Sequence, residues 1–115
     1  MEQMTEVFDS VARYFALLAE PTRLRIMHSI CQQEKSVNQI VQELGASQTN
    51  VSRHLGLMYQ AGVLGRRKDG NQVLYKVTDT AFTDICRTVC VRVAAELEGD
   101  PSLKRGVRSL IDELG

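Results

Sequence analysis

The feature that most constrains the fold of this 115-residue chain is a pair of helix signals joined by a very short turn. Apolar residues recur at helical spacing after Ser36 and again between Ser47 and Gly62. Gly45 suits the left-handed conformation that ends many helices, and Ser47 is a favoured N-terminal cap. Because only Ala46 separates these two signals, the second helix has to follow the first through a tight turn.

A β-hairpin signal comes directly after the two helices. Asp69-Gly70 is a strong turn dipeptide because both turn positions need positive φ, and apolar residues alternate from Val73 to Val77. We therefore expect two short strands joined across residues 66–71. Helix, tight turn, helix and hairpin in this order predict a winged helix-turn-helix, a mainly α fold with one small β-hairpin.

Three further helices are predicted around this unit. Thr5–Ala19 and Thr80–Leu97 carry apolar residues at helical spacing, and Pro21 suits the first turn of a helix that fades into a polar stretch. A last amphipathic segment is expected near the C-terminal end. The sequence thus predicts one domain over residues 1–97 and a C-terminal helical extension over residues 98–115.

The positive charge of the chain is concentrated in one stretch. Lysine and arginine number 14, as do aspartate and glutamate, so the formal net charge is zero. Residues 47–76 nevertheless hold five bases against one acid, Asp69. Because phosphates supply most of the affinity of DNA-binding proteins, this cluster favours contact with a DNA backbone.

The helix after Ser47 presents polar groups suited to reading bases, while Val51, Leu55 and Met58 take its inward face. A major groove about 12 Å wide accepts one helix, and recognition helices read bases from their first turns. We expect base or backbone contacts from Gln48, Thr49, Asn50, Ser52, Arg53 and His54, and phosphate contacts from Arg66, Arg67 and Lys68 on the hairpin. Two alternatives stay open: an ordinary solvated helix face, or a winged-helix interaction module that has lost DNA binding.

Several motifs together resemble the ArsR/SmtB family of repressors over roughly residues 8–97. They are LAEPTRL from Leu18, SQTNVSRHLGL from Ser47, AGVL from Ala61, and the stretch from Gly70 to Tyr75. The resemblance implies a homodimer, built through the first and fifth helices, that binds double-stranded operator DNA with an inverted repeat and releases it when an inducer arrives. It also implies that Ser47, Gln48, Thr49, Ser52, Arg53 and His54 lie on the recognition helix, and Arg66, Arg67, Lys68 and Asn71 on the wing.

The metal sites of many members of that family have no counterpart here. The zinc, cobalt and nickel sensors use Asp and His ligands on the fifth helix, where this chain has Asp84 but no histidine. The arsenic and cadmium sensors often carry Cys-x-Cys at the start of the third helix, where this chain has Ser36-Val37-Asn38. Persulfide-sensing relatives pair a fifth-helix cysteine with one near the position of His28.

Three cysteines remain as candidates for sensing or for holding a soft ion: Cys31, Cys86 and Cys90. The last two lie four apart on one helix face, with Cβ atoms about 5–6 Å apart. A disulfide needs roughly 3.5–4.5 Å, so a direct bridge would strain the helix. A soft ion such as arsenite, or a bridge with extra sulfur atoms, spans the gap more easily, with Cys31 as a third ligand. The alternatives are that the cysteines are small buried hydrophobes and that the inducer binds elsewhere.

Other classes of function find little support in the sequence. Neither histidine shares a local motif with a cysteine, and no phosphate loop or carboxylate pair stands out, so we expect no enzyme and no cofactor required for DNA binding. The N-terminal MEQMTEVFDS lacks the apolar core of a signal peptide, and no run is long enough to span a membrane. A cytoplasmic protein is the expectation.

Overall fold

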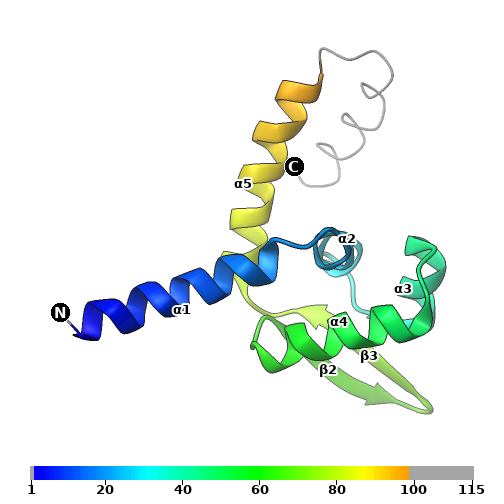
Figure 1. Cartoon of the computed structure of the whole chain (residues 1–115). Coiled ribbons are helices and arrows are strands. Elements are labelled where there is room, and N and C mark those ends of the chain that lie inside the picture. The colour runs from blue at the N-terminus through cyan, green and yellow to red at the C-terminus, as the bar shows by residue number, and fades with distance from the viewer. Residues whose placement is uncertain (1, 99–115) are drawn as a thin grey trace. The chain divides into compact units, whose positions relative to one another are not determined.

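The structure, a computed structural model, describes residues 2–98 (Figure 1). It divides the chain into two compact units, Met1–Asp79 and Thr80–Gly115. The expected helical extension lies outside the described residues, apart from residue 98. Among residues 2–98, none of the helices combines the length and the apolar run that crossing a bilayer needs.

Four helices belong to the first unit: α1 (Glu2–Leu18), α2 (Pro21–Ile30), α3 (Val37–Leu44) and α4 (Gln48–Gln60). Helix α1 begins three residues before the predicted start at Thr5. Between α1 and α2, the Glu20 carboxylate accepts a hydrogen bond of 2.9 Å from the backbone N–H of Arg23, and Pro21 follows as the first helical residue. The break between the two helices is therefore a cap followed by a proline, and the proline stands in the first turn, where the sequence predicts it.

The tight turn between α3 and α4 has the predicted local geometry. The Ser36 hydroxyl accepts from the Gln39 N–H at 3.2 Å, and the Gln39 side chain accepts from the Ser36 N–H at 2.8 Å, which makes a capping box. Gly45 adopts φ +67° and ends α3. Ser47 then caps α4 by accepting from the Asn50 N–H at 3.1 Å. These caps satisfy helix-end groups that would otherwise lack partners.

The wing is part of a three-stranded antiparallel sheet in the order β1-β3-β2. Its strands are β1 (Lys35–Ser36), β2 (Leu64–Asp69) and β3 (Gln72–Val77). The sequence did not reveal β1, because two residues are too short to show alternation. The predicted turn was also displaced: Asp69 pairs with Gln72 inside the hairpin, and the loop is Gly70-Asn71. Of these two loop residues only the glycine has positive φ, at +63°.

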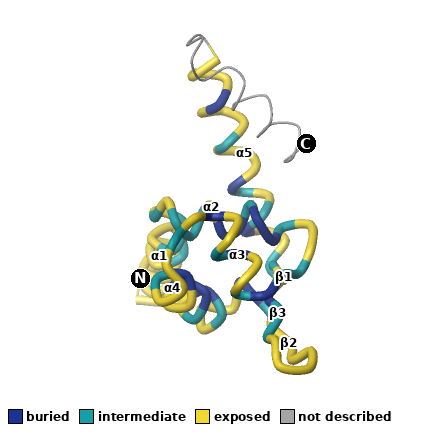
Figure 2. Tube along the Cα trace, turned by 90° about the vertical axis from the view of Figure 1, so that its right-hand side faces the viewer, coloured by how far each residue is buried: buried dark blue, intermediate teal, exposed yellow. Residues whose placement is uncertain are grey.

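The core of the first unit lies among α2, α3, α4 and the sheet, where burial is densest (Figure 2). Its fully buried side chains include Ile26, Met27, Ile30, Ile40, Val51, Leu55, Met58 and Val63. Burying one such side chain stabilises the fold by about 1.5–3 kcal/mol relative to exposing it. Helix α1 differs, because none of its residues is buried.

The described part of the second unit contains α5 (Thr80–Leu97), whose bounds are those predicted from the sequence. The apolar residues of α5 recur at helical spacing, but their burial differs. Phe82 and Cys86 are buried, whereas Val89, Val93 and Leu97 are exposed.

Candidate nucleic-acid interface

The first two turns of α4 present a polar surface to solvent. Gln48, Thr49, Ser52 and Arg53 are exposed, as predicted, and Asn50 is half-buried. Ser47 is exposed too, but its hydroxyl is engaged as the N-cap. The opposite face is anchored, since Val51, Leu55 and Met58 are completely buried. The buried stripe therefore holds the polar face outward as a rigid surface.

Arg53 is held along its own helix. Its Nη2 donates to the side-chain oxygen Oδ1 of Asn50 at 2.8 Å and lies 3.3 Å from His54 Nε2. Arginine in the first turns of a recognition helix can donate two hydrogen bonds to a guanine edge. Because Asn50 and His54 restrict the side chain, Arg53 is presented at a defined place rather than free in solvent.

The prediction that His54 reads DNA directly is wrong, because its side chain is buried and its residue is only 3% exposed. Residue 54 lies three positions after Val51 and four before Met58, which places it on the inward face of α4. Helical spacing alone contained this information. The polar character of histidine led to its assignment to the outer face.

His54 lies between two guanidinium groups. Its Nδ1 is 3.3 Å from Arg23 Nη1, and its Nε2 is 3.3 Å from Arg53 Nη2. Arg23 also donates to the carbonyls of Leu17 at 2.7 Å and Ala16 at 3.1 Å, at the end of α1. A neutral imidazole accepts through one nitrogen only, so it can accept from one arginine at a time. Burial, followed by the two positive neighbours, lowers the pKa of His54 despite the nearby Glu20 carboxylate.

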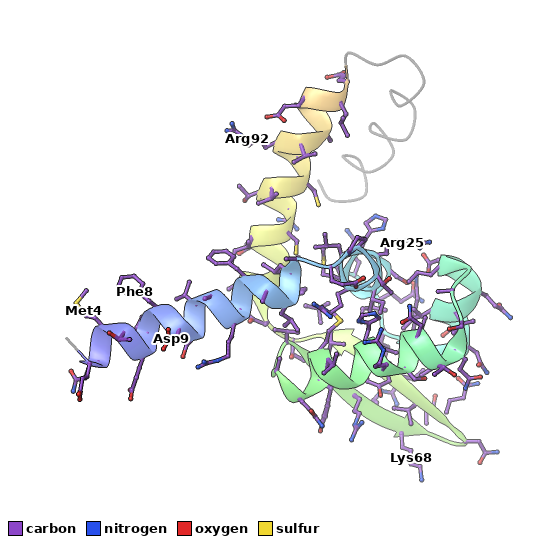
Figure 3. All side chains as sticks on the ribbon, viewed as in Figure 1. Met4, Phe8, Asp9, Arg25, Lys68 and Arg92 are labelled. Carbon is purple, nitrogen blue, oxygen red and sulfur yellow. The ribbon has the colours of Figure 1, made fainter. Side chains whose placement is uncertain are left out.

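The basic residues of the wing lie on both faces of the sheet, because side chains alternate along β2. Arg66 and Lys68 share one face, and Arg67 lies on the other. The Arg66 guanidinium carbon lies 3.9 Å from the ring centroid of Tyr59 on α4, which identifies that face as the one turned toward α4. Lys68 is exposed on the hairpin (Figure 3). Asn71, in the loop between Asp69 and Gln72, is exposed as well.

Arg66 keeps its full positive charge beside α4. Its pKa is raised by the neighbouring Tyr75 and Tyr59 side chains, and its guanidinium lies against the Tyr59 ring. Sequence reasoning missed Tyr59. The sequence signal that could have revealed this contact is an aromatic residue near the end of α4, close to a basic strand.

Arg67 is paired, which the sequence analysis did not anticipate. Its Nε donates to both carboxylate oxygens of Glu34 at 3.1 Å, and its Nη2 also bonds that carboxylate. This ion pair lowers the pKa of Glu34 and raises that of Arg67. The two residues lie 33 positions apart, so no local motif indicated the contact.

The candidate sensing cysteines belong to different units. Cys31 follows α2 and donates a long hydrogen bond of 3.4 Å to the His28 carbonyl. On α5, Cys86 is buried and Cys90 is half-buried, and burial raises the pKa of the Cys90 thiol. Within the described part of either unit, no three His, Cys, Asp or Glu side chains gather to hold a metal ion. The three-cysteine site remains a prediction.

The fold and the polar surface of α4 define a winged helix-turn-helix protein of the kind that regulates transcription. Comparison with known proteins gives the family. Residues 20–64 match the family model described as "Bacterial regulatory protein, arsR family". The solution structure of the homodimeric winged helix-turn-helix DNA-binding domain Mb0332 from Mycobacterium bovis superposes with a TM-score of 0.75 at 25% identity, covering 88% of this chain and 94% of that one.

Two named relatives agree with this result. A "probable mercury resistance operon repressor" of Streptomyces lividans is 36% identical over 77 residues, which span 67% of this chain and 62% of that protein. The HTH-type transcriptional regulator Rv0081 of Mycobacterium tuberculosis is 30% identical over 89 residues, spanning 74% of this chain and 78% of the regulator. The chain belongs to the ArsR family of transcription regulators.

Proposed function

We propose that the chain is a homodimeric repressor that binds an inverted-repeat operator through α4 and the wing. The observation that carries the proposal is the contact between two polar surfaces of one compact unit. The exposed first turns of α4 carry Arg53, and the side of the wing turned toward α4 carries Lys68 and Arg66, whose guanidinium lies over Tyr59 of α4. A groove-reading helix flanked by unneutralised cations is the arrangement that operator binding needs.

The residues of this surface have different proposed roles. Gln48, Thr49, Ser52 and Arg53 are the base-reading candidates, because they are exposed on the first turns of α4. Ser47 and Asn50 support them through the N-cap and through the hold on Arg53. Arg66, Lys68 and Asn71 are the backbone-binding candidates.

The test is a fluorescence-anisotropy titration of the full chain with a duplex from its own promoter and with a scrambled duplex of equal length. We expect tighter binding to the promoter duplex. Lys68→Ala should weaken binding to both duplexes, with the slope of log affinity against log salt shallower by about 0.9 per protomer. Arg92→Ala, which removes an exposed cation from α5, is the control. Equal affinity of the wild type for both duplexes would refute the proposal.

A second copy of the chain is the proposed partner of α1. Met4 and Phe8 lie along one side of this helix (Figure 3). These two side chains are 58% and 64% exposed, and Val7, Val11 and Phe15 are exposed as well. An apolar stripe of this length is costly to leave in water, and a two-fold dimer would cover it while doubling the base pairs that are read.

For the inducer we propose a soft, thiophilic ion bound by Cys86 and Cys90, in preference to a reactive sulfur species or an oxidant. Cys86 and Cys90 lie four positions apart on α5, with Cβ atoms about 5–6 Å apart, and a soft ion spans this gap without the strain that a direct disulfide would impose on the helix. Soft ions also prefer thiolate ligands. The name of the Streptomyces relative, a mercury resistance repressor, is consistent with this class of ligand.

The inducer test is release of the reduced protein from promoter DNA during titration with mercuric ion, arsenite, cadmium, polysulfide or peroxide. We expect release by one of the soft ions, and no release in Cys86→Ser or Cys90→Ser. Cys31→Ser reports separately whether the third cysteine takes part. Normal release in both α5 variants would place the inducer elsewhere. We propose no catalytic step, since the named relatives are regulators.

A further inference from the structure

The face of the wing turned away from α4 has its own charge arrangement, centred on the pair of Glu34 and Arg67. We propose that Glu34 withholds Arg67 from DNA and thereby limits the sequence-independent affinity of the wing for phosphate. The inference rests on the proposed function, because it concerns how strongly the wing grips a duplex.

The contact spans the whole sheet. Glu34 precedes β1, the edge strand next to β3, and Arg67 lies on β2 at the opposite edge. In the register, Leu74 of β3 stands opposite both Ser36 and Arg67, so these residues share one face. The Glu34 side chain therefore reaches across β3 to meet the guanidinium, and the carboxylate engages Nε and Nη2 together. Such two-pronged geometry is the strongest form of arginine–carboxylate pairing.

The ion pair has the properties of a competitor for phosphate. Arg67 and Glu34 have side chains that are 55% and 31% exposed, so a DNA phosphate can approach. Because exposed ion pairs contribute little to the free energy of folding, a gain in stability is a weak explanation for this contact. Because the hydrogen bond with Arg67 lowers the pKa of Glu34, the carboxylate is ionised at neutral pH. A phosphate arriving at Arg67 then has to displace an anion.

The two faces of the wing thus differ in available charge. Arg66 packs against the ring of Tyr59, a contact that leaves its charge free for DNA. Arg67 is held by a carboxylate, which cancels its charge. Lys76 shares the face of Arg67 and is also attracted to Glu34. Removing the Glu34 carboxylate would leave Arg67 and Lys76 on this face with the acid Asp69, so this side of the sheet would gain a net positive charge.

The experiment compares the full-length wild type, Glu34→Gln and the double variant Glu34→Gln/Arg67→Gln on the promoter and scrambled duplexes, between about 50 and 200 mM salt. We expect Glu34→Gln to bind both duplexes several-fold more tightly at the lowest salt. Its salt slope should be steeper by about 0.9 per protomer, an extra loss of roughly three- to fourfold across that range. The double variant should lose the gain. Glu96→Gln, which removes an acid paired on α5 with Arg92, controls for net charge.

Three results would overturn the inference. Weaker binding by Glu34→Gln would mean that the carboxylate orients Arg67 toward phosphate. A gain that persists in the double variant, or that Glu96→Gln reproduces, would mean that Arg67 is not the group released. An unchanged slope with a lowered melting temperature would make the contact structural. If the wild type already prefers its promoter duplex, each of these results leaves the proposed function intact, and wild-type failure to bind DNA would refute both.

Discussion

Helices α1 and α4 are both amphipathic, yet the structure uses their apolar stripes in opposite ways. In α4 the stripe of Val51, Leu55 and Met58 is completely buried within the chain. In α1 the corresponding stripe is exposed, and Phe8 is 64% accessible. Periodicity therefore identifies an apolar face without telling whether the chain itself or a second molecule covers it.

The difference in burial has consequences for how each helix acts. A stripe packed against its own core fixes the orientation of the helix, and α4 gains a rigid outward surface from it. The packing of an exposed stripe is completed only when a second molecule covers it. Substitutions in α4 should therefore change folding or base reading within one protomer, whereas substitutions in α1 should change assembly.

The largest expected effect breaks the buried stripe. Leu55→Ala should lower the free energy of unfolding by about 2–5 kcal/mol, because it removes a fully buried side chain and leaves a cavity. Urea unfolding followed by circular dichroism measures this. Leu57→Ala, on the exposed side of the same helix at 43% accessibility, is the matched control and should cost well under half as much. Equal losses would contradict the assigned faces.

The next effect concerns the exposed stripe. Phe8→Ala should weaken dimerisation by about 2 kcal/mol, near 30-fold in the dissociation constant, because buried aromatic residues dominate such interfaces. Sedimentation equilibrium over a range of concentrations measures the constant. Asp9→Ala, one position along α1, is the control and should leave it nearly unchanged. If both variants dissociate like the wild type, α1 is not the interface.

The third effect tests the outward surface of α4. Arg53→Ala should cost about 1–3 kcal/mol of discrimination between promoter and scrambled duplexes, because one base-reading side chain is lost. Lys68→Ala should weaken binding to both duplexes equally, so the pair of variants separates base reading from phosphate binding. The measurement is the ratio of the two affinities at one salt concentration. A preserved ratio in Arg53→Ala would remove the residue from the reading set.

The smallest effect concerns His54, on the inward face of α4. Burial lowers its pKa below the ordinary 6.5, so the unfolded chain binds the proton more readily than the folded one. Stability should therefore be constant above about pH 7 and fall as pH drops from 6.5 through the pKa of the folded state. Midpoints of urea unfolding, recorded at several pH values between about 5 and 7.5, give the slope of stability against pH. Replacing the group by His54→Gln should flatten it, and a wild-type slope in that variant would assign the titration elsewhere.

Much of the fold was predictable because its signals are local. The caps at Ser36 and Ser47, the end of α3 at Gly45 and the bounds of α5 follow from residues within a few positions of one another. Local rules also placed the exposed polar residues at the start of α4. They were less reliable at the hairpin turn, where Asp69 extends the strand instead of entering the loop.

Two features needed the tertiary structure: the contact of His54 with Arg23 and the pairing of Arg67 with Glu34. Each contact joins residues about 30 positions apart, so spacing along the chain does not set it. The inward position of His54, by contrast, follows from helical spacing, and the alternation of the wing bases follows once β2 is recognised as a strand. By itself, the sequence determined which segments become helices or strands and where their ends are capped. Packing decided which charges remain available to DNA, because neutralisation requires a partner that only the folded chain brings within hydrogen-bonding distance.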